Sequence, residues 1–301
     1  MTNEESKTKN ADLKFALFAF CILNCSLGVS ETVLAAAKLS GTLTIRDALA
    51  MPGRPVRIEA RLVHSALFAQ TGLGGEQLEF FAGERRIGQA MTGGDGRAFL
   101  EWTPRMRGNH AVTVKVAPGQ RVESVPASAI VACWERRRPI LLVEIGALAE
   151  ETKSPVVPLP RSPASVGRQE DPEPARDAVA VLKQLSQFFY NVIYLSHGET
   201  GPGSSMGDTG DVREWLRRHE FPPGLSLTVK AGRTALEEKL DELKAEGWDN
   251  VQAGVGRTVE FAEVLLAHRM KVVILEGANQ LDKLPKKAQA VKDWKEVRKK
   301  L

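Results

Sequence analysis

The sequence lacks the features of several protein classes. Its 301 residues include only three cysteines, too few for a disulfide scaffold, and its five histidines are scattered, without the spacing of a zinc site. Its composition, with 43% hydrophobic and 26% charged residues, is that of a globular protein rather than a disordered chain or a multi-span membrane protein. It also lacks the glycine-rich fingerprints of nucleotide-binding loops.

Charge of one sign is in excess only at the C-terminal end. The 41 basic and 37 acidic residues leave a net charge of +4, and residues 284–301 alone carry seven basic and two acidic side chains. The rest of the chain is nearly neutral, which excludes the extended basic surface of a nucleic-acid-binding protein. At roughly 150 residues per domain, the length predicts two domains.

Residues 1–38 have the pattern of a secretory signal peptide or an N-terminal membrane anchor. A polar start precedes an uncharged apolar run at 15–29, and the small residues 35–37 follow. The run is shorter than the roughly 20 residues of a spanning helix. We therefore expect an exported or membrane-anchored, extracytoplasmic protein. A cytoplasmic protein with a buried N-terminal helix is the alternative.

Residues 39–135 read as short strands separated by glycine and proline turns. Residues 56–63 alternate apolar and polar side chains, as in a half-buried strand. Residues 78–90 read as a hairpin, and 92–96 contain three glycines, which accept the positive φ of tight turns. With further runs at 98–102, 111–116 and 127–134, about seven strands predict an all-β antiparallel sandwich.

This segment resembles bacterial immunoglobulin-like (Ig-like) modules. The likeness rests on GRPVRIEARL, then LEFFAGERRIGQAMTGGDGRAFLEW, then RGNHAVTVKV. The resemblance implies a spacer or an adhesion surface and no catalytic chemistry.

Residues 136–282 predict a doubly wound α/β domain, so that the chain as a whole is multidomain. Residues 140–143 form a continuous apolar run, typical of a strand buried on both faces of a parallel sheet. Helical and strand patterns then alternate as far as residue 275. The Pro-rich stretch 151–174 reads as an extended insertion.

Candidate functional residues follow three of the predicted strands of this domain. They are Glu144 and Gly146 after the first strand, Ser196 after the second, and Gly256, Arg257 and Phe261 after the fourth. In order and spacing, residues 138–275 resemble the haloacid-dehalogenase (HAD) superfamily, most nearly its lipin-like phosphatidate phosphatases. The resemblance implies an aspartate nucleophile, a second acid/base aspartate, a lysine and Mg²⁺. Lys230 and Lys239 are both open candidates for the lysine, although helix register points to Leu236.

The residues present do not supply that chemistry. Glu144 is one methylene longer than aspartate, and Gly146 has no side chain to protonate a leaving group. Arg257 adds a positive charge where a metal ligand should be, and Phe261 cannot ligate a metal. The sequence therefore predicts no confident catalytic residue, no metal and no cofactor. We expect Glu144 and Arg257 to pair in the space of the former metal site.

Other roles remain open for the polar residues at these strand ends. Ser196 and Gly256 are candidate ligand-binding residues, but a hydroxyl bonded to the backbone and a glycine that permits close packing are the simpler interpretations. His197 and Glu199 are a candidate replacement acid/base pair.

Residues 283–301 predict a basic amphipathic helix. Apolar residues recur every three or four positions, at Leu284, Ala288, Val291, Trp294, Val297 and Leu301. The helix either docks on the α/β domain with a solvated basic face or also touches anionic lipid headgroups.

The sequence thus predicts a non-catalytic HAD-like protein, a pseudo-phosphatase, that presents a binding or interaction surface beside an Ig-like module. Its partner would be an unidentified protein or a phosphorylated ligand, with membrane contact through the N-terminal segment and the tail, and no nucleic acid. The alternatives are a Mg²⁺-dependent, phosphatidate-phosphatase-like enzyme with altered catalytic residues and a plain structural module.

Overall fold

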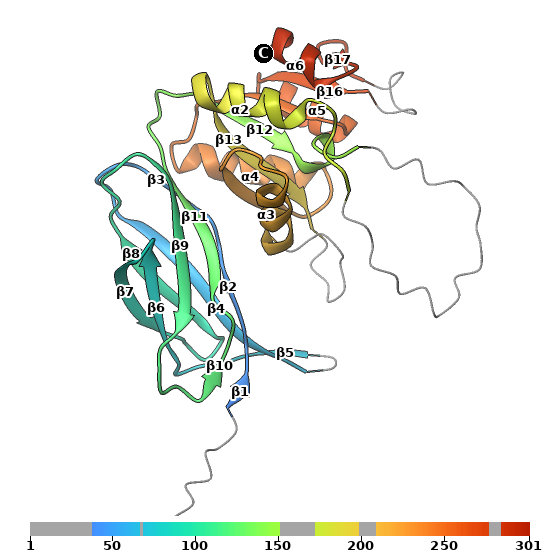
Figure 1. Ribbon diagram of the computed structural model, residues 1–301. Coiled ribbons are helices and arrows are strands. Elements are labelled where there is room, and N and C mark those ends of the chain that lie inside the picture. Colours follow the sequence, from blue (N-terminus) through green and yellow to red (C-terminus); the bar gives the residue numbers. More distant parts are fainter. Residues whose placement is uncertain (1–37, 67–68, 151–171, 199–208, 277–283) are drawn as a thin grey trace, which may run out of the picture. The chain divides into compact units, whose positions relative to one another are not determined.

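The computed structural model describes residues 38–66, 69–150, 172–198, 209–276 and 284–301 (Figure 1). Leu39–Leu301 form one compact unit, and three apolar cores lie within it. Residues 1–37 of the predicted signal or anchor segment, most of the Pro-rich insertion, and Glu199 lie outside the described residues. None of the helices in the described ranges has the length and apolar character needed to cross a bilayer.

The protein is strand-rich, and the described part that ends at Cys133 contains strands and no helix. Its strands are β1 (Leu39–Ser40), β2 (Thr42–Ile45), β3 (Ala48–Ala50), β4 (Val56–Ala66), β5 (Ala69–Gly72), β6 (Gln77–Ala82), β7 (Arg85–Met91), β8 (Arg97–Trp102), β9 (Gly108–Val116), β10 (Val122–Glu123) and β11 (Ala127–Cys133). The expected strands are all present, and an all-β first part is confirmed.

Two sheets of this part share one core. The first has the order β3-β11-β9-β6-β7, and in the second β4 pairs with β2, β5 and β8. Alternate residues of both sheets point inward, such as Ile58 of β4 and Phe80 of β6, each 0% exposed, because side chains of a strand alternate between its faces. The pairing is mostly antiparallel, as predicted, but β1–β10 and β3–β11 are parallel pairs that the alternation of side chains does not reveal.

The predicted glycine turn at 92–96 requires glycine at its last position. Gly96 has φ +76°, and a Cβ there would clash with the carbonyl oxygen of Leu62, which accepts a backbone hydrogen bond from Leu73. Gly94, two residues earlier, has open space around the position of its Cβ. Backbone conformation and close packing therefore fix Gly96 but not Gly94.

We expect Gly96→Ala to lower the free energy of unfolding by about 2 kcal/mol or more, because it combines an unfavourable φ with a clash against backbone. Gly94→Ala is the matched control and should change it by less than about 0.5 kcal/mol. Urea unfolding of Leu39–Leu301, followed by tryptophan fluorescence, measures both. Equal midpoints for the two variants would contradict this account of the turn.

The described chain alternates strands with helices from Ile140 to Leu275, and a further strand and helix follow. The strands are β12 (Ile140–Glu144), β13 (Asn191–His197), β14 (Leu225–Val229), β15 (Val251–Gly256), β16 (Lys271–Leu275) and β17 (Gln289–Val291). The helices are the 3₁₀ helix η1 (Ile145–Ala147), α2 (Ala178–Phe188), α3 (Thr209–Arg218), α4 (Arg233–Ala245), α5 (Val259–Ala267) and α6 (Trp294–Lys300).

These strands form one parallel sheet with the order β14-β13-β12-β15-β16-β17. All five residues of β12 are buried, because β12 is central and both faces of the sheet are covered. The apolar sides of α2, α3 and α6 pack into one core, and those of α4 and α5 pack into another. The uninterrupted apolar run at 140–143 therefore has the structural cause that the sequence predicted.

The prediction of one amphipathic helix over 283–301 is wrong. Residues 289–291 form strand β17 at the edge of the parallel sheet, and α6 begins only at Trp294, with Asp293 as its N-cap. The apolar spacing arises from two different packing partners. Leu284 and Ala288 pack against the core that contains α4 and α5, whereas Trp294 and Val297 pack into the core that contains α2. The tail is nevertheless docked on the sheet, and its cations lie outside.

Candidate functional site

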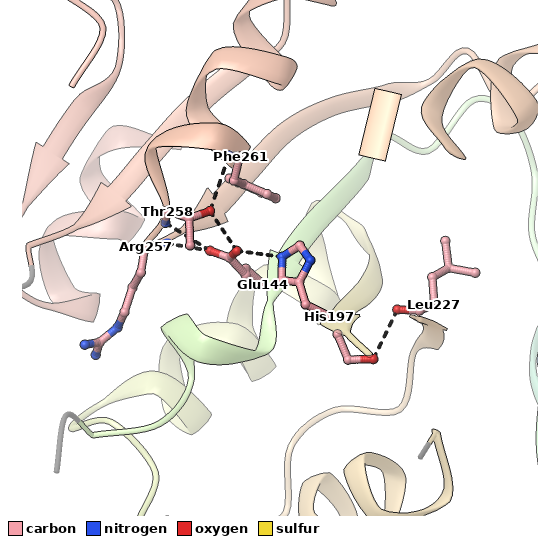
Figure 2. A network of polar contacts seen from close by, with 7 residues as sticks. Glu144, His197, Leu227, Arg257, Thr258 and Phe261 are labelled. Carbon is pink, nitrogen blue, oxygen red and sulfur yellow. Dashed lines mark hydrogen bonds and ion pairs between the residues drawn. The ribbon is translucent and has the colours of Figure 1, made fainter. Parts of the chain in front are cut away.

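The parallel sheet reverses its order at β12. The chain passes from β12 to β13 and β14 on one side, then returns to β15 on the other. In open α/β sheets of this kind, ligands bind outside the carboxyl ends of the strands at the point of reversal. Glu144 is the last residue of β12, His197 the last of β13, and Arg257 directly follows β15 (Figure 2).

The Glu144 carboxylate connects these three strand ends. Its Oε1 accepts hydrogen bonds from His197 Nε2 at 2.9 Å and from Thr258 Oγ1 at 2.9 Å (Figure 2). Its Oε2 accepts from the backbone N–H of Arg257 at 2.7 Å and of Thr258 at 3.2 Å. The side chain is only 3% exposed, and a carboxylate has about four acceptor positions. The chain itself therefore fills the hydrogen-bonding capacity of this carboxylate.

The environment holds Glu144 and His197 as an ion pair. Burial by itself raises the pKa of Glu144, but the hydrogen bonds from His197, Arg257 and Thr258 outweigh it and the pKa lies below its ordinary value. The hydrogen bond to Glu144 raises the pKa of His197, against the opposing effect of burial, with a further contribution from the backbone of Lys230. Both shifts favour the charged forms.

Thr258 has two roles at the start of α5. Its Oγ1 accepts a hydrogen bond from the backbone N–H of Phe261, which makes it the N-cap, and the same hydroxyl donates to Glu144. The unpaired amides and positive dipole end of a helix N-terminus attract an anion. In this protein that anion is the carboxylate of Glu144.

Phe261 and Gly256 serve packing. Phe261 is 1% exposed on the inner side of α5. A Cβ at Gly256 would lie 2.5 Å from Phe261 Cδ1 and 2.8 Å from Glu144 Oε2, so only glycine lets both side chains approach β15. The packing interpretation of Gly256 is confirmed, and the structure places the Phe261 ring in the core.

Ser196 lies one residue before the His197 strand end and bonds away from Glu144. Its hydroxyl is 2.9 Å from Thr228 Oγ1 and donates to the carbonyl oxygen of Leu227 at 3.4 Å, both on β14. The simpler interpretation, a strand-end hydroxyl bonded to backbone, is what the structure shows.

The expected ion pair between Glu144 and Arg257 is wrong. Arg257 contacts the carboxylate through its backbone N–H, and its guanidinium points away from it in Figure 2. Nη2 of Arg257 instead donates to the carbonyl oxygen of Ala149 at 2.9 Å. The reason is local: the residue before the N-cap of α5 turns its amide toward β12, which directs its side chain elsewhere. His197 takes the place that we expected for Arg257.

Gly146 lies in η1 and is exposed, and a Cβ there would meet no atom within 4 Å. Packing would thus allow an acidic side chain at this position. Among the described residues, no group of three or more His, Cys, Asp or Glu side chains is placed to hold a metal ion. The hydrogen-bond donors that surround Glu144 and the buried ring of Phe261 do not fit Mg²⁺.

Sequence reasoning missed the pairing of His197 with Glu144 and the role of Thr258. It placed His197 in an acid/base pair with Glu199, which lies outside the described residues. The signals were nonetheless present, because the carboxyl ends of adjacent parallel strands meet at one edge and bring positions 144 and 197 together. A threonine directly before an apolar helical run is likewise a typical N-cap.

Comparison with known proteins identifies no family for this chain. No family model matches it, and no curated protein matches it. Among solved structures, the CARDB domain of a Pyrococcus furiosus protein is similar at 14% identity, over 31% of this chain and 87% of that domain, with a TM-score of 0.24. The M1 domain of titin is similar at 17% identity, over 31% of this chain and 91% of that domain, with a TM-score of 0.20. A putative glycoside hydrolase from Bacteroides vulgatus covers 79% of this chain and 58% of its own length at 8% identity and a TM-score of 0.18. TM-scores this low support no inference about activity.

We expect Glu144→Gln to lower the free energy of unfolding by about 3 kcal/mol, because an amide places donors against groups that already donate and leaves His197 without its counter-charge. Urea unfolding near pH 6 measures the loss. Glu214→Gln is the control, since Glu214 pairs with Arg217 on an exposed helix surface and should leave the urea midpoint almost unchanged. A loss below about 1 kcal/mol for Glu144→Gln would contradict the central role of this carboxylate.

The ion pair between Glu144 and His197 also predicts a range of pH in which it stabilises the folded protein. The raised pKa of His197 means that its contribution is complete below the ordinary value of 6.5 and is lost as pH rises through the folded-state pKa. The lowered pKa of Glu144 means that its contribution is present above the ordinary value of 4.5 and is lost as pH falls through the folded-state pKa. The stability difference between the natural protein and His197→Gln should therefore be largest between about pH 4.5 and about pH 6.5. A difference that stayed the same from well below pH 4.5 to well above pH 6.5, measured from urea midpoints, would exclude an ion pair.

Proposed function

We propose that this chain is a non-catalytic protein that presents a binding or interaction surface, with an α/β domain similar to HAD phosphatases joined to an Ig-like module. One observation carries the proposal. The carboxylate at the position that the resemblance gives to the nucleophile, Glu144, accepts four hydrogen bonds from its own chain.

The sheet topology supports the resemblance. A central strand at the reversal of the strand order, helices on both faces and a carboxylate at the end of the central strand are the arrangement expected of a doubly wound, HAD-like domain. The two packed sheets before it likewise support an Ig-like module.

The contacts of the site argue against phosphoryl transfer through Glu144. A nucleophilic carboxylate must present a lone pair to phosphorus, and both oxygens of Glu144 already accept two hydrogen bonds each. Gly146 supplies no acid/base group, and the magnesium that such a reaction needs has no fitting set of ligands. This geometry best supports a protein that keeps the fold of the domain but does not catalyse phosphoryl transfer.

The same contacts bear on the kind of partner. A phosphate group would bind most readily at the amides that begin α5, but Glu144 takes the N–H groups of Arg257 and Thr258. A phosphorylated ligand would have to displace a buried carboxylate at this position. A protein partner that contacts the outer surface is therefore favoured.

A hydrolase with altered catalytic residues is the second candidate, and the pairing of Glu144 with His197 favours it. A carboxylate that orients an imidazole is a common part of acid/base sites. However, Nε2 of His197 is bonded to Glu144, and the ring also interacts with the backbone of Lys230. The described residues place no nucleophilic side chain on this imidazole.

We expect Leu39–Leu301 to show neither Mg²⁺-dependent hydrolysis of p-nitrophenyl phosphate or phosphatidate nor Mg²⁺ binding at millimolar concentration. Phosphate release and isothermal titration calorimetry measure the two. Turnover above the blank that Glu144→Ala abolishes would overturn the proposal and establish the hydrolase.

A gain-of-function variant tests the resemblance itself. Gly146→Asp has room for its side chain, so E144D/G146D/R257D would restore three of the four carboxylates of a HAD site without crowding at position 146, and the buried Phe261 is left unchanged. We expect this variant to gain Mg²⁺ binding, whereas G146D alone, the control, should not. If the triple variant folds and binds no Mg²⁺, the HAD-like assignment of these positions is wrong.

A further inference from the structure

Two large apolar side chains are exposed side by side at the end of α2. Phe188 is 67% exposed and Phe189 is 60% exposed, with their rings in an edge contact at 6.3 Å between centroids. Single exposed apolar residues are ordinary on protein surfaces, but adjacent exposed phenylalanines are a typical feature of an interaction site. Phe99, by contrast, is covered by the guanidinium of Arg57 at 3.7 Å.

Basic residues of α6 lie beside the same side of α2, within one helical turn of Phe188 along that helix. Helices α2 and α6 pack together through their buried sides (Figure 1). Gln184 lies one helical turn before Phe188, on the same side of α2, and lines a groove of about 520 Å³ together with Arg298 and Lys299. Lys300 follows directly and is also exposed.

Within the part of the chain that the structure describes, no acidic side chain forms an ion pair with Arg298, Lys299 or Lys300. Asp177, at the far end of the groove, pairs with Lys295 at 3.4 Å and with Arg176 at 3.7 Å. Glu296 accepts a hydrogen bond from the backbone N–H of Lys292. Cations at a helix C-terminus are favourable for the helix dipole alone, but that role does not explain the neighbouring pair of exposed aromatic rings.

We propose that Phe188, Phe189, Arg298, Lys299 and Lys300, which we call the α2/α6 face, bind the surface of an anionic lipid bilayer. Apolar rings that enter the headgroup region, next to cations that meet lipid phosphates, are the combination that holds proteins at a membrane surface. The charge and the apolar character of the face are both complementary to such a surface. This proposal uses no residue of the Glu144 site and does not depend on the proposed function.

Sedimentation with vesicles tests the proposal. Leu39–Leu301 contains all three cores, so it can be used without the N-terminal apolar segment. At low salt it should bind phosphatidylcholine vesicles that contain phosphatidylglycerol, and bind pure phosphatidylcholine vesicles much less. Each cation near such a surface strengthens binding, so R298E/K299E should lower the partition coefficient roughly tenfold or more.

Two further variants separate the contributions. F188S/F189S should weaken binding to the anionic vesicles and remove the binding that persists at high salt, because the apolar contribution is not screened. R85E/R105E makes the same change of charge on exposed residues of the β-sheet part and is the matched control, with binding unchanged. Urea midpoints confirm that each variant is folded.

Three outcomes would overturn the proposal. The natural protein could fail to bind anionic vesicles, which would leave the face to an acidic protein partner. R85E/R105E could weaken binding as much as R298E/K299E, which would mean unspecific attraction by net charge. F188S/F189S could bind as well as the natural protein, which would assign no role to the aromatic pair. None of these results would alter the hydrolysis or magnesium tests, so the two proposals can fail separately.

Discussion

A carboxylate that is buried away from water must receive hydrogen bonds, because an unpaired one costs several kcal/mol. Glu144, at 2% exposure, imposes this constraint on the centre of the parallel sheet. The end of β13 supplies His197, and the start of α5 supplies two amides and the hydroxyl of Thr258. The absence of a side chain at Gly256 lets the carboxylate reach those amides. The positions of three strand ends and one helix are thus coupled through a single side chain.

The same donors that make Glu144 stable there limit what it can do. Each hydrogen bond favours the ionised carboxylate, and each also occupies a lone pair that a metal ion or an electrophile would need. The N-terminus of α5 has the amides that could bind a phosphate, but the Glu144 carboxylate of the same chain already occupies them. A site at the usual place for ligands in an open α/β sheet therefore functions as an internal connection between elements.

The regular elements could be predicted because their causes are local. The continuous apolar run at 140–143 requires burial on both faces, and the alternation at 56–63 requires burial on one. The site could be predicted only in position, since Glu144 and the residues after β15 lie at strand ends that must meet. Its contacts could not, because sequence order does not show that Arg257 meets Glu144 through its amide. The prediction for the C-terminal tail was wrong for a related reason. Apolar residues spaced three and four apart fit a helix, but Ala290 and Val291 pair with β16 instead.

The polar groups of this α/β unit are of two kinds. Some form hydrogen bonds or ion pairs within the chain, and others stay exposed at its surface. Glu144 is buried and the His197 side chain is 31% exposed, and as an ion pair the two carry no net charge. Arg298, Lys299 and Lys300 lie on a short helix whose buried side is anchored by Trp294 and Val297. That anchoring keeps these cations at the surface, where Arg298 and Lys299 line a groove alongside α2. The recognition that we propose for this unit is therefore better placed on its outer surface than at its strand ends, where groups of the same chain already bind one another.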